Sequence, residues 1–69
     1  MEMIPVQSEA VSAIGYDGQN LHITYRGGGK TYIHPNVPRH VADGLMAAES
    51  KGKYIAKHIR LQHPGQAIR

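Results

Sequence analysis

The sequence predicts an α+β domain in which a three-stranded antiparallel β-meander is followed by two α-helices packed on one sheet face. Three observations lead to this prediction. In the first half of the chain, segments that alternate apolar and polar side chains are separated by short glycine-containing turns. In the second half, apolar residues recur every three or four positions, which is the period of a helix. Cysteine is absent from the 69 residues, so neither a disulfide nor a cysteine-ligated metal stabilises the fold.

The three predicted strands cover residues 11–16, 21–25 and 30–34. The first is rich in β-branched and apolar residues and is followed by an Asp-Gly pair, a strong turn signal because glycine adopts positive φ at little cost. The second alternates cleanly, and three consecutive glycines then form the next turn. In the third strand, Tyr32 and His34 share one face. Because both turns are short, successive strands are expected to pair antiparallel.

Two helices are predicted after the strands. The first covers residues 37–48, where Pro38 suits the first turn and Asn36 is the better capping residue. Gly44 lies inside this helix and costs about 1 kcal/mol relative to alanine, which indicates a close packing contact at that position. The second helix follows Ser50, whose hydroxyl suits the N-cap, and ends before residues 63–65.

These elements make one domain of residues 8–64, with residues 1–7 and 65–69 as flexible termini. The apolar faces of the strands and helices predict the core: Val11, Ile14, Leu21, Ile23, Tyr25, Val37, Val41, Leu45, Ala48, Ile55 and Ile59. A core of this size gives marginal stability. A monomer or a weak homodimer is therefore expected.

Several function classes have no support in the sequence. No apolar run is long enough to span a bilayer and no leader pattern begins the chain, so a soluble cytoplasmic protein without membrane contact is expected. The five histidines lack the i, i+4 spacing that places two imidazoles on one helix face, so neither a metal nor another cofactor is predicted. Residues 27–31 resemble the end of a phosphate-binding loop, but a strand follows where such a loop requires a helix. No catalytic constellation is visible, so the protein is predicted not to be an enzyme.

The charge is distributed unevenly along the chain. Residues 1–49 contain three cations and five acids, whereas residues 50–69 contain five cations and no acid, and the whole chain carries +3. Lys53, Lys57 and Arg60 are spaced four and three apart and should share a helix face, which Lys51 and Arg69 extend. Such a stripe suits contacts to phosphate. The alternatives are a solvated face that keeps the protein soluble, and an ion pair between Arg60 and Asp17 or Asp43.

The third strand carries a second candidate feature. Tyr32 and His34, on one sheet face, would offer an edge on which bases stack, as in several proteins that bind single-stranded nucleic acids. The alternative is that Tyr32 packs against the helices and leaves its hydroxyl at the rim. Tyr25 continues the apolar stripe of the second strand and is expected to belong to the core.

Taken in order, the motifs resemble the KTSC domain, which is named for its occurrence at the C-terminus of some lysyl-tRNA synthetases. The resemblance begins at Ser8 and rests on the ordered motifs Ile-Gly-Tyr-Asp (14–17), Tyr-x-His (32–34), Val-Pro (37–38), Ser-x-Gly-x-Tyr (50–54) and Ile-Arg (59–60). The family also includes free-standing bacterial or phage proteins of this length. His34 stands where the family has the second aromatic of its central Tyr-x-Tyr motif, and Ile55 and Ala56 stand where it usually has Phe and Asn.

The resemblance and the basic segment together predict a small, non-enzymatic binding module. Its expected ligand is RNA or another polyanion, bound weakly by Lys51, Lys53, Lys57, Arg60, Tyr32 and His34. The alternative is a protein–protein interaction adaptor, such as a phage or bacterial accessory factor that docks on a larger complex.

Overall fold

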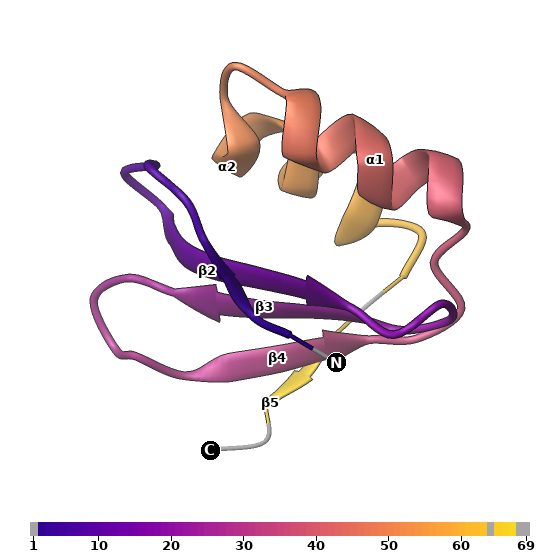
Figure 1. The fold of residues 1–69 in the computed structure, drawn as a ribbon, viewed down its shortest axis with the longest axis horizontal. Helices are drawn as coiled ribbons and strands as arrows, with labels where there is room; N and C mark the ends of the chain where they lie inside the picture. The colour runs from indigo at the N-terminus through magenta and orange to yellow at the C-terminus, as the bar shows by residue number, and fades with distance from the viewer. Residues whose placement is uncertain (1, 64, 68–69) are drawn as a thin grey trace.

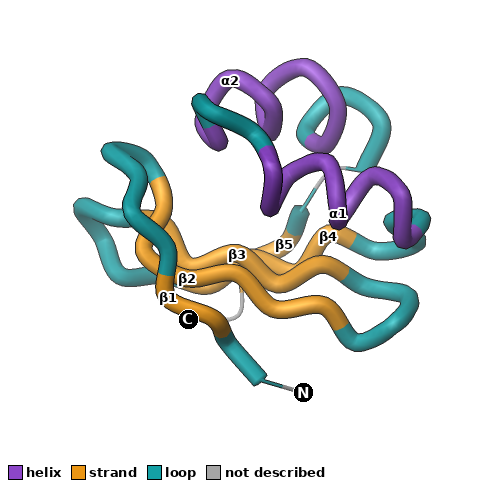
Figure 2. Tube along the Cα trace, turned by 45° about the horizontal axis from the view of Figure 1, so that its top comes forward, coloured by secondary structure: helices purple, strands orange, loops and turns teal. Residues whose placement is uncertain are grey.

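The computed structural model describes residues 2–63 and 65–67, and in it one antiparallel sheet is covered on one face by helices (Figure 1). The elements in chain order are β1 (Ile4–Pro5), β2 (Val11–Tyr16), β3 (Leu21–Tyr25), β4 (Thr31–His34), α1 (Arg39–Ala47), α2 (Lys51–Tyr54), the π-helical turn η1 (Ile55–Ile59) and β5 (Gln66–Ala67). The strands lie in the sheet in their sequence order. Figure 2 shows the helices on one side and no helix on the other. The predicted α+β architecture, with an antiparallel sheet and two helical segments, is therefore confirmed.

The predicted number of strands is wrong, because the sheet has five strands and not three. The central meander matches the prediction, but β1 pairs with β2 and β5 pairs with β4 at the two edges. Both added strands are two residues long, too short to show the alternation from which a strand is recognised. They lie in the segments 1–7 and 65–69 that were predicted to be flexible; residues 1, 64, 68 and 69 are outside the described residues.

The strand register decides which side chains face the helices. Ile23 pairs with Tyr32 and Leu21 pairs with His34, so these side chains lie on the inner face. The buried state of Leu21, Ile23 and His34 agrees with this assignment. On the outer face, the hydroxyls of Thr24 and Thr31 lie 2.7 Å apart. Tyr32 and His34 thus share a face as predicted, and that face is the one toward the helices.

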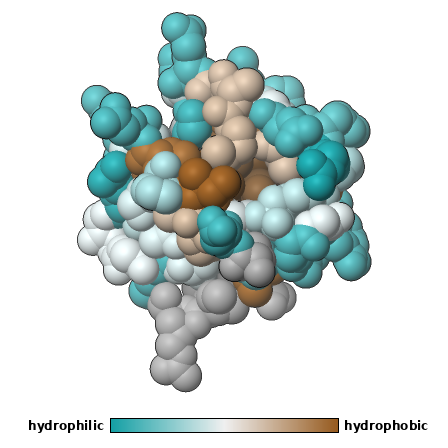
Figure 3. Space-filling view, viewed as in Figure 1, coloured by the Kyte–Doolittle hydropathy of each residue, from teal (hydrophilic) through white to brown (hydrophobic). Residues whose placement is uncertain are grey.

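The core lies between the sheet and the helical layer. Nine apolar residues are buried there: Val11, Ile14, Leu21, Ile23, Val37, Ala42, Leu45, Ile55 and Ile59. Eight of them were predicted. Ala42 takes the central position on α1, whereas Val41 and Tyr25 are only partly buried against the core. In the space-filling view the strongest apolar colour lies between the helices and the sheet, with hydrophilic residues around it (Figure 3).

The second helical segment starts as predicted and then changes its hydrogen-bond pattern. The Ser50 hydroxyl accepts a hydrogen bond from the backbone N–H of Lys53 at 3.5 Å, which confirms the predicted N-cap. After Tyr54 the helix widens, and the N–H of Arg60 donates to the carbonyl of Ile55, five residues back, at 2.8 Å. A turn closed by an i→i+5 bond contains more residues than an α turn. Arg60 is therefore rotated away from the α-helical register that aligned it with Lys53.

A close contact between the helices explains the glycine inside α1. The Tyr54 hydroxyl donates to the Val41 carbonyl at 2.9 Å, and its ring lies directly over Gly44. A β-carbon on Gly44 would lie 2.9 Å from Tyr54 Cζ and closer still to the hydroxyl. Only glycine leaves room for this hydrogen bond, so the predicted packing contact is confirmed.

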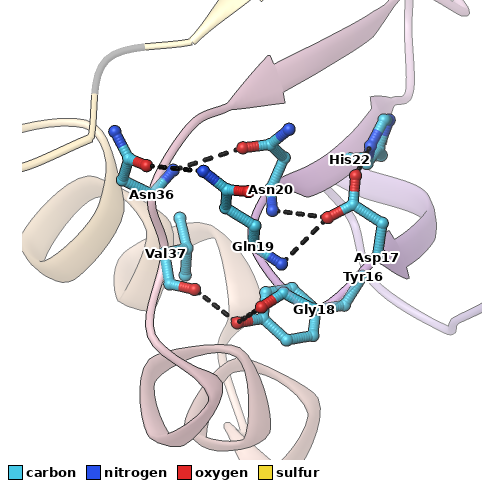
Figure 4. A network of polar contacts seen from close by, with 8 residues as sticks. All are labelled: Tyr16, Asp17, Gly18, Gln19, Asn20, His22, Asn36 and Val37. Carbon is cyan, nitrogen blue, oxygen red and sulfur yellow. Dashed lines mark hydrogen bonds and ion pairs between the residues drawn. The ribbon is translucent and has the colours of Figure 1, made fainter.

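A polar network joins the β2–β3 turn to the loop before α1 (Figure 4). One oxygen of the Asp17 carboxylate accepts from the backbone N–H groups of Gln19 and Asn20, at 2.9 and 2.6 Å. The Tyr16 hydroxyl donates to the carbonyl of Val37 on the other side of the network. These backbone bonds lower the pKa of Asp17 from 3.8 to about 2. The turn therefore holds its charge over nearly the whole pH range.

Within the described part of the chain, no helix has the length and apolar character that a membrane crossing requires.

Candidate functional site

A pocket of about 530 Å³ lies beside the β3–β4 hairpin. This volume is within the range of small-ligand sites. Two strands, the hairpin turn and the end of the helical segment contribute its main lining residues, which are Tyr25, Arg26, Lys30, Tyr32, His34 and Arg60. Aromatic rings and cations therefore meet in a single cavity.

The two tyrosines form the aromatic part of the pocket. The rings of Tyr25 and Tyr32 pack edge to face, with centroids 5.3 Å apart and planes at 82°. Both side chains are half-buried. Because the edge of one ring rests on the other, Tyr32 is held in place by protein contacts before any ligand arrives. Tyr25 was predicted to belong to the core; it packs against the core but is only partly buried, and it also lines this pocket.

His34 lies at the buried end of the pocket and uses both of its ring nitrogens. Nδ1 lies 2.7 Å from the carbonyl oxygen of His63, and Nε2 lies 3.3 Å from the Tyr25 hydroxyl. A carbonyl oxygen can only accept, so Nδ1 carries the proton and Nε2 accepts from the Tyr25 hydroxyl in the neutral ring. The side chain is only 2% exposed. The expectation that His34 offers an exposed edge for stacking or phosphate contact is therefore corrected.

Burial shifts the proton equilibria of this pair. Loss of solvent lowers the pKa of His34 below its usual 6.5, and the positive charge of Arg60 lowers it further. The hydrogen bond to the His63 carbonyl acts in the opposite direction, because it favours the protonated ring. Burial likewise raises the pKa of the Tyr25 phenol, although Arg60 opposes the rise. Both groups are thus neutral at pH 7, and the charge of the pocket comes from its arginines and lysine.

Two cationic side chains from separate segments, Lys30 and Arg60, line the pocket, and Arg26 lies at its edge. Arg60 is brought there by the π turn, and Arg26 and Lys30 flank the three-glycine turn. Arg26 also donates to the backbone carbonyls of Ser8 and Val6, which fixes its side chain against the N-terminal segment. In the structure of residues 2–63 and 65–67, the only ion pair within 4.0 Å joins Asp17 and His22, so no carboxylate neutralises these cations.

The structure separates the predicted basic stripe into parts. Lys53, Lys57 and Arg60 are all exposed, but Arg60 lines the pocket, whereas Lys53 lines a second hollow between the start of α2 and residues 7–10. In this second hollow, Lys51 and Lys53 lie with Glu9 and Glu49, so its charges balance. The Lys51 ammonium group also donates to the Ala48 carbonyl at the end of α1. Arg69 is outside the described residues. The positive surface is thus concentrated at Arg60 and the hairpin.

Sequence reasoning missed Arg26 and Lys30 as members of a site. The signal was present, because both residues flank a glycine turn and Lys30 lies two positions before Tyr32. Residues at the ends of paired strands converge at the hairpin turn, so cations on both sides of a short turn are neighbours in space. Arg60 was predicted, but its approach to the hairpin depends on the π turn, for which the sequence shows no recognisable signal.

Comparison with known proteins identifies the family of this chain. The family described as the KTSC domain matches residues 7–63, and the chain belongs to this family. A protein of Tsukamurella paurometabola is 44% identical over 54 residues, which cover 77% of this chain and 81% of that protein. The crystal structure of a KTSC domain protein from Yersinia pestis superposes with a TM-score of 0.90 at 31% identity, covering 99% of this chain and 97% of the other.

Proposed function

We propose that this KTSC domain is a non-enzymatic module that binds single-stranded RNA through the pocket between the β3–β4 hairpin and Arg60. The observation that carries the proposal is that Lys30 and Arg60, which have no carboxylate partner among the described residues, line the same pocket as two packed tyrosine rings. Phosphate contacts supply affinity that does not depend on sequence, and aromatic rings supply stacking for unpaired bases.

The electrostatic part of the proposal rests on Arg60 and Lys30 in the pocket and on Lys57 outside it. Each neutralised phosphate releases counterions from the nucleic acid, so binding weakens steeply as salt rises. Three contacts are few, and the affinity is therefore expected to be weak. Lys57 is exposed on the helix three residues before Arg60 and extends the positive surface beyond the pocket.

The stacking part rests on Tyr32. Tyr32 lines the pocket, and its half-buried ring packs edge to face with the ring of Tyr25. A base stacked on such a ring contributes about 1–3 kcal/mol. This contribution requires an unpaired base, so single strands are expected to bind better than duplexes. The association of the family with lysyl-tRNA synthetases agrees with RNA as the ligand.

The hydrogen bonds of the His34 imidazole, which lines the pocket, agree with a binding role rather than with catalysis. A general base needs a free lone pair within reach of a substrate proton. In His34 the Nδ1 proton is donated to His63 and the Nε2 lone pair accepts from Tyr25. The ring thus serves the structure, and the remaining polar groups of the pocket suit recognition.

Fluorescence anisotropy with a labelled single-stranded RNA, at 50 and 200 mM salt, tests the proposal. The wild-type protein should bind the single strand in a salt-dependent way and bind the matching duplex more weakly. Arg60→Gln and Tyr32→Leu should each weaken binding several-fold, whereas Arg39→Gln, which removes a cation from the start of α1, should not. Absence of binding at low salt with tens of micromolar protein would refute it.

The alternative is a protein–protein adaptor, and one observation favours it. In the part of the chain that the structure describes, no helix covers the outer face of the sheet, whose edges are the short strands β1 and β5 (Figure 2). Edge strands can pair with an added strand from a partner. If RNA binding fails in the anisotropy test, crosslinking of the intact protein in cells becomes the informative experiment for this role.

A further inference from the structure

We infer that the pocket is selective for a phosphomonoester, such as the phosphorylated end of an RNA strand, over an internal phosphodiester. This inference rests on the proposed function and makes it more specific. It comes from the number of cations in the pocket, from the geometry of Arg60, and from the closed side formed by the C-terminal segment.

The charges of the pocket exceed what one internal phosphate neutralises. Lys30 and Arg60 line a single cavity of about 530 Å³, and no carboxylate of the described residues lies within 4.0 Å of either. An internal phosphodiester carries one negative charge, whereas a phosphomonoester carries about 1.5 to 2 at pH 7. The second charge of the monoester is therefore favoured where two cations line the same cavity.

Arg60 is suited to hold the additional oxygen. It lines the same cavity as Tyr25, His34 and Lys30, so a phosphate bound there lies within its reach. A guanidinium binds two oxygens of a phosphate through a planar pair of N–H donors. A monoester presents three terminal oxygens and leaves one for Lys30, whereas a diester presents only two.

The C-terminal segment limits the pocket on one side. Gly65 lines the pocket and packs so closely on the His34 ring that a β-carbon there would lie 2.5 Å from Cε1. The carbonyl of His63 is bound to the same ring. Because this contact leaves no space between the C-terminal segment and His34, a ligand in the pocket cannot extend past the segment on this side. The end of an RNA strand fits this arrangement better than an RNA strand that continues in both directions.

Three versions of one labelled oligonucleotide test the inference by fluorescence anisotropy. The first carries a terminal phosphate, the second carries a terminal hydroxyl, and the third carries a terminal methyl phosphate, which retains the phosphorus but only one charge. Both ends of the strand are examined in turn. The phosphorylated oligonucleotide should bind on the order of tenfold more tightly than the other two at one end at least, as expected for charge-assisted hydrogen bonds.

Protein variants identify the pocket as the source of this preference. Arg60→Gln should remove the preference for the phosphorylated end, and Lys30→Gln should reduce it. Lys57→Gln, on the exposed helix surface outside the pocket, should weaken all three oligonucleotides by the same factor. Circular dichroism confirms that each variant is folded before binding is compared.

The outcomes separate this inference from the proposed function. Equal affinity for the three oligonucleotides would overturn the inference and leave RNA binding intact, whereas absence of binding to all three would overturn both. A nucleoside monophosphate as competitor then distinguishes a free nucleotide from a strand end. If the nucleotide displaces the labelled strand at a concentration close to the Kd of that strand, the site binds a free nucleotide. If displacement needs a much higher nucleotide concentration, the site binds a strand end.

Discussion

The imidazole of His34 on β4 donates a hydrogen bond from Nδ1 to the carbonyl oxygen of His63, 2.7 Å away and 29 positions later in the chain. Its Nε2 accepts from Tyr25 on the neighbouring strand. One buried side chain thus joins the sheet, the end of the helical segment and the pocket. The KTSC resemblance would place an aromatic ring at this position, and histidine fills it with a flat ring that also forms two hydrogen bonds.

The first prediction concerns pH. Because burial lowers the pKa of His34 in the folded protein, His34 binds a proton near pH 6.5 in the unfolded chain but only at lower pH in the folded chain. The stability from this residue is therefore complete above pH 6.5 and decreases as the pH falls below that value. Urea unfolding of the wild type between pH 7.5 and 5 should show this decrease, and His34→Gln should show less of it. His40→Gln, which removes an exposed histidine from α1, should behave as the wild type; an identical decrease in H34Q would contradict the assignment.

The second prediction concerns Gly65. A β-carbon at this position would lie 2.5 Å from Cε1 of His34, so Gly65→Ala should displace the C-terminal segment and β5. The expected cost is about 1–3 kcal/mol, the usual range for overpacking. Hydrogen exchange of β4 amides and urea unfolding measure the effect. Gly28→Ala is the control, because its β-carbon would meet only Lys30 Cγ at 3.9 Å, and equal stability of G65A and G28A would refute the contact.

The third prediction concerns Gly44, where the usual rule for helices should reverse. Glycine to alanine inside a helix normally stabilises a protein by up to about 1 kcal/mol. Here the new methyl group would overlap the Tyr54 ring, so Gly44→Ala should destabilise the fold. In a Tyr54→Leu background, the same substitution should be neutral or stabilising. A thermal unfolding series of the four proteins measures this coupling, and additive effects would contradict it.

The fourth prediction concerns acid unfolding. The backbone N–H groups of Gln19 and Asn20 lower the pKa of Asp17 to about 2 in the fold, below its ordinary value of 3.8. The contribution of Asp17 is therefore present above pH 4 and is lost as the pH falls from about 4 to 2. Asp17→Asn should show a smaller loss of stability over this interval, as followed by circular dichroism. Asp43→Asn, on the exposed surface of α1, serves as the control and should keep the wild-type profile.

Much of the fold was predictable from local patterns. The meander, both helical segments and eight of the nine core residues follow from alternation, helical spacing and turn chemistry. Local rules also predicted the Ser50 cap and the contact at Gly44, because a capping hydroxyl and a glycine inside a helix each have few explanations. These features depend on neighbours within a few residues of one another.

The remaining features depend on contacts between distant segments. The edge strands β1 and β5 have two residues each and form only because the sheet is already present. The burial of His34 depends on a carbonyl that the chain supplies much later, so its position at a strand end indicated exposure instead. Helical spacing aligned Arg60 with Lys53, and the π turn separated them. The sequence therefore indicated the pocket only in part, through Tyr32 and Arg60. The cations at the hairpin, Arg26 and Lys30, were missed.

The salt dependence of RNA binding in two matched double variants tests the central claim most directly. Lys30→Gln with Arg60→Gln removes two charges from the pocket, whereas Lys51→Gln with Lys53→Gln removes two charges from the hollow that Glu9 and Glu49 share. The account predicts that the first pair weakens binding and reduces the slope of log K against log salt by about two, and that the second pair changes neither by much. Equal losses in the two double variants would contradict it, because the affinity would then follow net charge and not the pocket.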